Sequence, residues 1–343
     1  MVKLSVAIPV KNDFAEVILT VANLTKGISP EKLQVIVVND GSVFGSGKFR
    51  PIGDIFEYPN VVRVDNHFSG GVGYSFDRGA ELVNSDILVI MGSDIRVREG
   101  WYDKVVEAVQ SYPNTLGCAV SIGLNEDRMD MDDPKCSIRY GADLLVKVGA
   151  EDLPKNSRLL KKDGTYTALF KSKWITEKKS DSPYKIPSLL GAFYFTSRDY
   201  YNKLGGWDTQ AGERYMGHRF WGNLEPHISL KSWLYGGGCM LFPDIEAGHI
   251  FGRIIKNDRW KKGLRSPEWL YWNQLFIAET LVEDEFRQEL YDYLHYEKTL
   301  GMAQRMIRDN YSDILKVRER NLRFANGKLL SKEMVDGHKL IIQ

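Results

Sequence analysis

The feature that most constrains the fold is an alternation of short apolar runs and helical segments in the first hundred residues. Leu4–Val10 and Leu33–Val38 are branched and almost continuously apolar, as are parallel strands that are buried on both faces. Between them, residues 13–25 have the spacing of an amphipathic helix, with Asn12 or Asp13 placed to cap it. A strand, a helix and a second strand in this order predict a βαβ unit.

The alternation continues beyond this unit. A third strand is expected at Val61–Asp65, a helix from about Gly73 to Asn84, and a fourth strand at Asp86–Met91. Together these segments predict an α/β fold with a Rossmann-like, mostly parallel central sheet flanked by helices. Ligands of such sheets bind beyond the carboxyl ends of the strands, which here read PVKND, NDGS and GSDIR.

The rest of the chain is less regular. From about Ser121 to Lys185 the sequence is polar and weakly periodic, so we expect variable excursions around a site. Order returns with further strands and helices, and beyond Pro267 the pattern becomes helical and charged. We therefore expect three parts, namely residues 1–120, residues 121–266 and a helical C-terminal extension in residues 267–343.

Composition narrows the class of protein. A hydrophobic fraction of 43% in 343 residues can bury one large core or two modest ones, and a net charge of +1 announces no nucleic-acid or membrane partner. The three cysteines, Cys118, Cys136 and Cys239, fit neither a disulfide framework nor a zinc knuckle, which favours a reducing compartment. Without a leader pattern or a run of about 18 apolar residues, we expect a cytoplasmic protein.

Six motifs follow one another along about Leu4–Tyr271. They are SVAIPVKND, VVNDGS, RGAELVNSDILVIMGSDIRVREGW, GAFYFTSRDYYNKLGGWD, FWGNLE and AGHIF. In this order they resemble the GT-A glycosyltransferases, most closely the catalytic domain of the polypeptide N-acetylgalactosaminyltransferases. The resemblance implies a GT-A fold with a nucleotide-sugar-binding half in residues 1–120 and an acceptor- and metal-binding half in residues 121–266.

The resemblance also implies contacts to a nucleotide sugar, with UDP as the expected nucleotide. Asp40 is expected to accept a hydrogen bond from uracil N3. The alternative interpretation is that Asp40 is an ordinary turn residue. Backbone groups from Pro9 to Asn12 would line the base, and Asp13 would either hold the ribose or cap the helix. Further expected donor contacts are those of Arg78, Ser93 and Arg253. Arg78 fits an exposed helix position equally well.

Asp94 follows the fourth predicted strand, where a departing diphosphate must be neutralised. A carboxylate can bind a hard cation, and that cation neutralises the charge of the diphosphate. The resemblance implies that Asp94 is a direct metal ligand, that an acidic residue is missing at Gly92, and that His249 is a second ligand rather than a packed or surface histidine. Two diphosphate oxygens and water would complete an octahedral site for Mn²⁺ or Mg²⁺.

The segment from Trp221 marks the place where donor sugar and acceptor would meet. The resembled family carries Trp-Gly-Gly-Glu-Asn here, so either Leu224 or Glu225 stands at its glutamate. Glu225 would orient the acceptor, act as a base, or simply be an acid favoured at a helix N-terminus. Trp221 and Asp208 are further catalytic candidates, with a turn role as the alternative for Asp208, and His227 is another.

These features predict a metal-dependent glycosyltransferase that moves a sugar from a UDP donor to a hydroxyl group, with retention implied by the resemblance. The basic segment Arg253–Arg265 is expected to be a donor lid or a solvated loop, and it also suits a polyanion. Hydroxylated bases in DNA and glycan hydroxyls are therefore both candidate acceptors. The alternatives are a non-catalytic sugar-nucleotide binder and an inverting polysaccharide enzyme with Glu225 as base.

Overall fold

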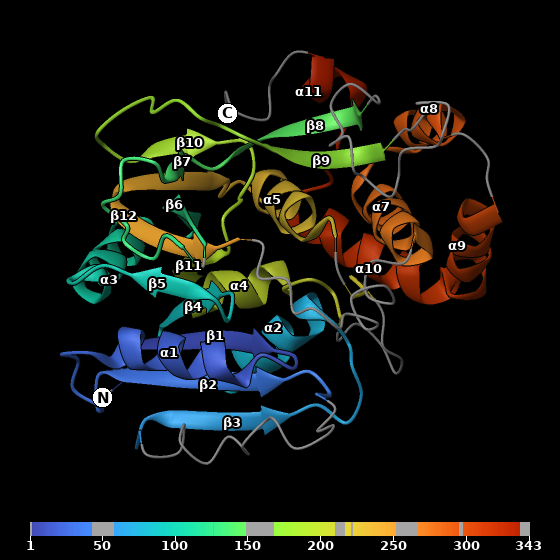
Figure 1. Cartoon of the computed structure of the whole chain (residues 1–343). Coiled ribbons are helices and arrows are strands. Elements are labelled where there is room, and N and C mark those ends of the chain that lie inside the picture. The colour runs from blue at the N-terminus through green and yellow to red at the C-terminus, as the bar shows by residue number, and fades with distance from the viewer. Residues whose placement is uncertain are drawn as a thin grey trace.

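The computed structural model describes residues 2–42, 58–125, 127–148, 168–209, 217–220, 222–251, 267–294 and 298–336. Its centre is one twisted sheet (Figure 1). In the order in which they pair, its strands are β10 (Tyr184–Ile186), β12 (Cys239–Ile250), β6 (Leu116–Leu124), β11 (Phe193–Ser197), β4 (Ile87–Met91), β1 (Leu4–Val10), β2 (Leu33–Asn39) and β3 (Val61–Asp65). Two short strands extend it, since β5 (Ile95–Val97) pairs with β12 and β7 (Ser137–Arg139) pairs with β6.

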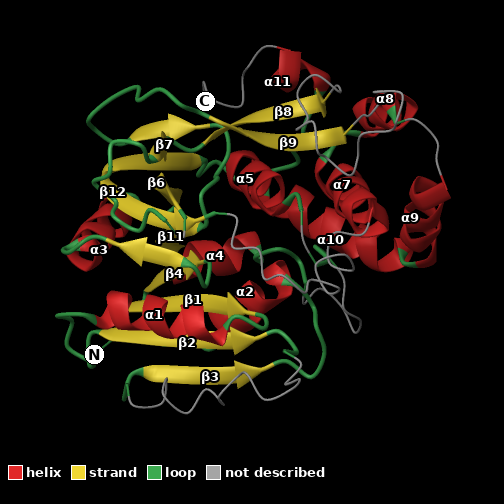
Figure 2. Ribbon diagram, in the orientation of Figure 1, coloured by secondary structure: helices red, strands yellow, loops and turns green. Residues whose placement is uncertain are grey.

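The half of the sheet from β4 to β3 is parallel, as the apolar runs predict. All seven residues of β2 are buried, because helices cover both faces of this half. Ile36 and Val38 point into one core, which includes residues of α2 (Val72–Glu81), and Val35 and Val37 point into the other, which includes residues of α1 (Phe14–Thr25) and α3 (Trp101–Ser111). Figure 2 shows α1 lying across one face of these strands.

The predicted cap of the first helix is wrong in its chemistry. Asp13 occupies the N-cap position of α1, but its side chain makes no capping hydrogen bond. Asn12 has a positive φ of 59°, and its backbone N–H donates to Ser42 Oγ at 3.0 Å. The turn is therefore also joined to the segment that follows β2.

The segment expected to be irregular contains regular structure. Besides β6, β7 and β10, it supplies an antiparallel pair formed by β8 (Ala142–Val148) and β9 (Ala168–Trp174). In Figure 1 this pair lies above α5 (Leu224–Leu234) and beside the C-terminal helices. It is a two-stranded sheet separate from the central one.

The helical C-terminal extension is confirmed. It comprises α7 (Pro267–Leu281), α8 (Asp284–Tyr293), α9 (Lys298–Asp309), α10 (Tyr311–Phe324) and α11 (Lys332–Asp336). Trp272 and Phe276 of α7 are completely buried in the core shared with α5 and β9. Among the described residues, we find no helix whose length and apolar character would suit it to cross a membrane.

A buried ion cluster around Asp208 ties this extension to the rest of the molecule. Asp208 has a φ of 61° and follows α4 (Arg198–Leu204), and its carboxylate contacts Lys231 Nζ at 2.9 Å, His227 Nε2 at 3.1 Å and the guanidinium of Arg320 on α10. Burial alone would raise the pKa of Asp208, but Lys231 and Arg320 more than offset this and hold it well below its usual range. The catalytic roles considered for Asp208 and His227 are thus replaced by structural ones.

We expect Asp208→Ala to lower the free energy of unfolding by about 3–5 kcal/mol, because it leaves Lys231 as a buried charge without its carboxylate. Since the folded-state pKa is depressed, this stabilisation is complete above the ordinary aspartate range and is lost as the pH falls below it. Urea unfolding at neutral pH measures the loss. Asp181→Ala, which removes an exposed partner of Lys178, is the control and should leave stability unchanged. Equal stability of both variants would show that the cluster contributes nothing.

Candidate active site

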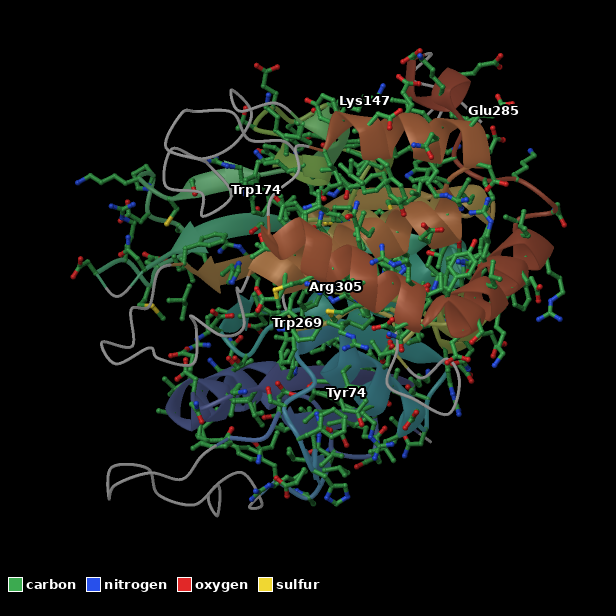
Figure 3. All side chains as sticks on the ribbon, turned by 90° about the vertical axis from the view of Figure 1, so that its right-hand side faces the viewer. Tyr74, Lys147, Trp174, Trp269, Glu285 and Arg305 are labelled. Atoms are coloured by element: carbon green, nitrogen blue, oxygen red, sulfur yellow. The ribbon has the colours of Figure 1, made fainter. Side chains whose placement is uncertain are left out.

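A cleft of about 770 Å³ opens where β1 and β4 end. Its walls come from strand ends, from the start of α5, from the β8–β9 pair and from α7. They include Pro9, Gly92, Ser93, Asp94, Phe170, Lys171, Trp174, Ala192, Tyr194, Asn223, Leu224, Glu225, His249, Phe251, Leu270 and Gln274. Figure 3 shows Trp174 of β9, Trp269 of α7 and Tyr74 of α2 on the same side of the molecule.

The structure brings the two predicted metal ligands together. The antiparallel pairing of β5 with β12 sets His249 opposite Ile95, and the backbone N–H of Ile250 donates to the carbonyl of Asp94 at 3.1 Å. As a result, His249 Nε2 lies 3.4 Å from Asp94 Oδ1, and both side chains line the cleft. Neighbouring ligands of an octahedral ion with bonds of about 2.1 Å stand about 3 Å apart, so this imidazole and carboxylate fit one hard cation.

The cation would need ligands besides these two. Within the described part of the chain, no group of three His, Cys, Asp or Glu residues is arranged to hold a metal. Gly92 lies beside the predicted site but carries no side chain that could bind a metal. A Cβ built at Gly92 would stand 2.9 Å from Asp94 Oδ1. A side chain at residue 92 would therefore point at the predicted site, and glycine leaves that space open.

Glu225, and not Leu224, presents a carboxylate to the cleft. It lies in the first turn of α5, and Tyr194 Oη donates to its Oε1 at 3.1 Å. The Leu224 side chain is buried, and its carbonyl accepts from Trp207 Nε1 at 2.9 Å. Burial raises the pKa of Glu225, while its own backbone N–H, Tyr194 and His249 oppose that rise. Both residues line the cleft, and the carboxylate is that of Glu225, whose role stays a prediction.

Asp40 has a role that the sequence does not reveal. It is 4% exposed, and it accepts hydrogen bonds from the backbone N–H groups of Gly70 at 2.8 Å and Gly71 at 3.1 Å. The hydroxyls of Ser69 and Ser75 donate to it at 2.8 and 3.2 Å, and so does the amide of Asn66 at 3.2 Å. The carboxylate therefore fixes the loop that enters α2, and a uracil contact would have to compete with these donors.

The other predicted donor contacts divide into three groups. Pro9 and Ser93 line the cleft. Arg78 does not, since it pairs with Glu81 along a partly exposed face of α2, so the exposed helix position is the correct alternative. Arg253, with the rest of the basic segment, lies outside the described residues, as does the catalytic candidate Trp221.

Sequence reasoning missed several residues of the cleft. Trp174 lies at the end of β9, in the segment taken to be irregular, and its ring packs edge-on against Phe251 with centroids 6.2 Å apart. The ring centroids of Phe251 and His249 are in turn 4.1 Å apart. Tyr194 sits in the apolar run Phe193–Ser197, where period-two alternation could have marked it as facing away from Phe193 and Phe195.

Comparison with known proteins agrees with this geometry. Residues 5–168 match the family model described as Glycosyl transferase family 2. The chain is 27% identical over 251 residues to Polypeptide N-acetylgalactosaminyltransferase 8 of Drosophila melanogaster, covering 72% of this chain and 38% of that protein. It is 22% identical over 223 residues to Polypeptide N-acetylgalactosaminyltransferase 5 of Caenorhabditis elegans, covering 64% of this chain and 30% of that protein. It thus spans well under half the length of these relatives.

A solved structure, GalNAc-T7 with UDP, GalNAc and Mn²⁺, aligns over 100% of this chain and 57% of its own, with a TM-score of 0.66 at 16% identity. In a mixed, mostly parallel sheet of this kind, ligands bind beyond the carboxyl ends of the strands. The chain has the GT-A fold, and its residues 5–168 resemble glycosyl transferase family 2.

The two roles of Asp40 can be separated by experiment. We expect Asp40→Asn to lower the free energy of unfolding by about 1–3 kcal/mol, because several buried donors lose a charged acceptor. Urea unfolding measures this loss, and calorimetry at low temperature measures the affinity of the folded variant for UDP. A variant of unchanged stability that no longer binds UDP would instead assign Asp40 to the base.

Proposed function

We propose that this protein is a metal-dependent glycosyltransferase that moves a sugar from a UDP donor to a hydroxyl group. The observation that carries the proposal is the approach of Asp94 Oδ1 and His249 Nε2 to 3.4 Å in a cleft that also holds Glu225. Relatives named as N-acetylgalactosaminyltransferases, and a similar fold solved with UDP and Mn²⁺, support the donor class.

Asp94 and His249 would hold the cation, and Mn²⁺ suits this mixed oxygen and nitrogen donor set. When bound, the cation supplies charge neutralisation for a leaving diphosphate. Pro9 and Ser93 lie at the strand ends next to this pair, where a nucleotide would be positioned. Thr20 Oγ1 donates to the carbonyl of Ser93 at 2.7 Å and so fixes the loop that carries Asp94.

Aromatic and polar residues of the cleft have the chemistry of a sugar site. Trp174, Phe170 and Phe251 offer aromatic surface, and Asn223 and Glu225 offer polar groups among them. The Asn223 amide donates to the carbonyl of Phe170 at 2.7 Å, which joins the start of α5 to β9. An anionic Glu225 near the reacting carbon would also stabilise positive charge that develops there during transfer.

We include retention of configuration in the proposal, because the motif resemblance implies it. The acceptor is left as a hydroxyl group of a glycan, a polypeptide or a hydroxylated base in DNA. The names of the relatives favour a polypeptide or glycan acceptor. A non-catalytic sugar-nucleotide binder is the competing function, since Gly92 removes a side chain from the metal site.

We expect Asp94→Ala and His249→Ala each to lower the affinity for Mn²⁺ in the presence of UDP, and to reduce hydrolysis of a UDP-sugar by at least about 100-fold. Calorimetry measures binding, and release of UDP measures turnover. Asp132→Ala, at a residue whose side chain is 75% exposed, is the control and should resemble the wild type. Full activity of the wild type in excess chelator would remove the metal from the proposal.

The stereochemical course gives a separate test. With an α-linked UDP-sugar and a simple alcohol or sugar acceptor, we expect an α-linked product, which proton NMR identifies from the coupling constant of the anomeric hydrogen. A β-linked product would establish inversion and favour Glu225 as the catalytic base. Tight donor binding without hydrolysis or transfer would favour the non-catalytic binder.

A further inference from the structure

Three hydrogen bonds in succession join the metal loop to the carboxylate of Glu225. The backbone N–H of Gly92 donates to the carbonyl of Ala192 at 3.0 Å. The backbone N–H of Ala192 donates to Tyr194 Oη at 3.0 Å, and Tyr194 Oη donates to Glu225 Oε1 at 3.1 Å. The backbone of one residue, Ala192, thus connects Gly92, two residues before Asp94, to the tyrosine that contacts Glu225.

The direction of the last bond is fixed by the one before it. Tyr194 is 4% exposed, and its hydroxyl oxygen accepts the only hydrogen of the Ala192 amide. The hydroxyl's own hydrogen is then the one available to Glu225, and a donor on an ionised carboxylate forms a stronger bond than one on a neutral acceptor. The hydrogen bond therefore favours one orientation of the Glu225 side chain and opposes the rise in the Glu225 pKa that burial causes.

The backbone that aims this amide is held in an unfavourable conformation. Ala192 has a φ of 62°, in the left-handed region that residues with a Cβ rarely adopt, and it follows Gly191 at 121°. Such conformations persist where the surrounding structure holds them, and both neighbouring hydrogen bonds of Ala192 do so here. Both Ala192 and Tyr194 line the cleft together with Glu225.

We propose that Tyr194 is a positioning residue for transfer, and that its hydroxyl, aligned by the Ala192 peptide, holds the Glu225 carboxylate toward the sugar. This inference rests on the proposed glycosyltransferase function. It assigns to Tyr194 a role through Glu225 rather than direct contact with the reacting atoms.

The test compares the wild type with Tyr194→Phe, Glu225→Gln and the double variant, using hydrolysis of a UDP-sugar with Mn²⁺ and calorimetry with UDP and Mn²⁺. We expect Tyr194→Phe to lower kcat by about 10- to 100-fold, since a misaligned group costs that much. Its KM for the donor and its affinity for UDP should stay within about twofold, because the nucleotide contacts are unchanged. In the Glu225→Gln background, adding Tyr194→Phe should change kcat by less than about twofold, because the two residues act as one unit.

Tyr200→Phe is the matched control. Tyr200 is also a fully buried tyrosine, 1% exposed, and its hydroxyl bonds to Ser232 away from the cleft. It should lose stability as Tyr194→Phe does while keeping the wild-type kcat. The inference is overturned if Tyr194→Phe keeps the wild-type kcat, or if it lowers kcat equally in the Glu225→Gln background. A wild-type protein that neither binds nor cleaves any nucleotide sugar would overturn the proposed function instead.

Discussion

The position of the cleft depends on one buried carboxylate, that of Asp208. It lies between Lys231 on α5, the helix that also carries Glu225, and Arg320 on α10. The pKa of Lys231 is lowered by its burial to about 8, which shows how strongly the interior opposes its charge. Asp208 offsets that cost, so the C-terminal helices and α5 are held as one body. The orientation of α5, and with it the placement of Glu225 in the cleft, follows from this cluster.

The chain of hydrogen bonds from Gly92 to Glu225 adds a second constraint on the same carboxylate. α5 fixes Glu225 from one side, and the strained peptide of Ala192 fixes it through Tyr194 from the other. Because Ala192 also accepts from Gly92, the loop that carries Asp94 and the helix that carries Glu225 share one rigid connection. Preorganised groups of this kind stabilise charge without rearranging during the reaction. The two ends of the cleft are thus built as a single unit.

The sequence predicts the parts of this protein that depend on local pattern. The runs at β1, β2 and β4 are recognisable because parallel strands are buried on both faces. The approach of Asp94 and His249 agrees with the motif resemblance, and their role as metal ligands stays a prediction. Tyr194 and Asp40 escape prediction, since their partners lie about thirty residues away in the chain, as Glu225 and Gly70 do. The β8–β9 pair escapes because Lys171, Ser172 and Lys173 interrupt the apolar pattern of β9, so that its sequence reads as a loop.

The small number of metal ligands has a consequence for how donor and cation bind. In the part of the chain that the structure describes, only Asp94 and His249 are placed to hold the proposed cation, and under the proposal diphosphate oxygens and water would supply other positions of an octahedral shell. The donor alone or the cation alone would then meet an incomplete site. Each of the two would increase the affinity of the protein for the other by the same factor. The space beside Gly92 removes the side chain that could have held the cation without donor. Under the proposed function, metal binding would therefore depend on the presence of the donor whose diphosphate the cation neutralises.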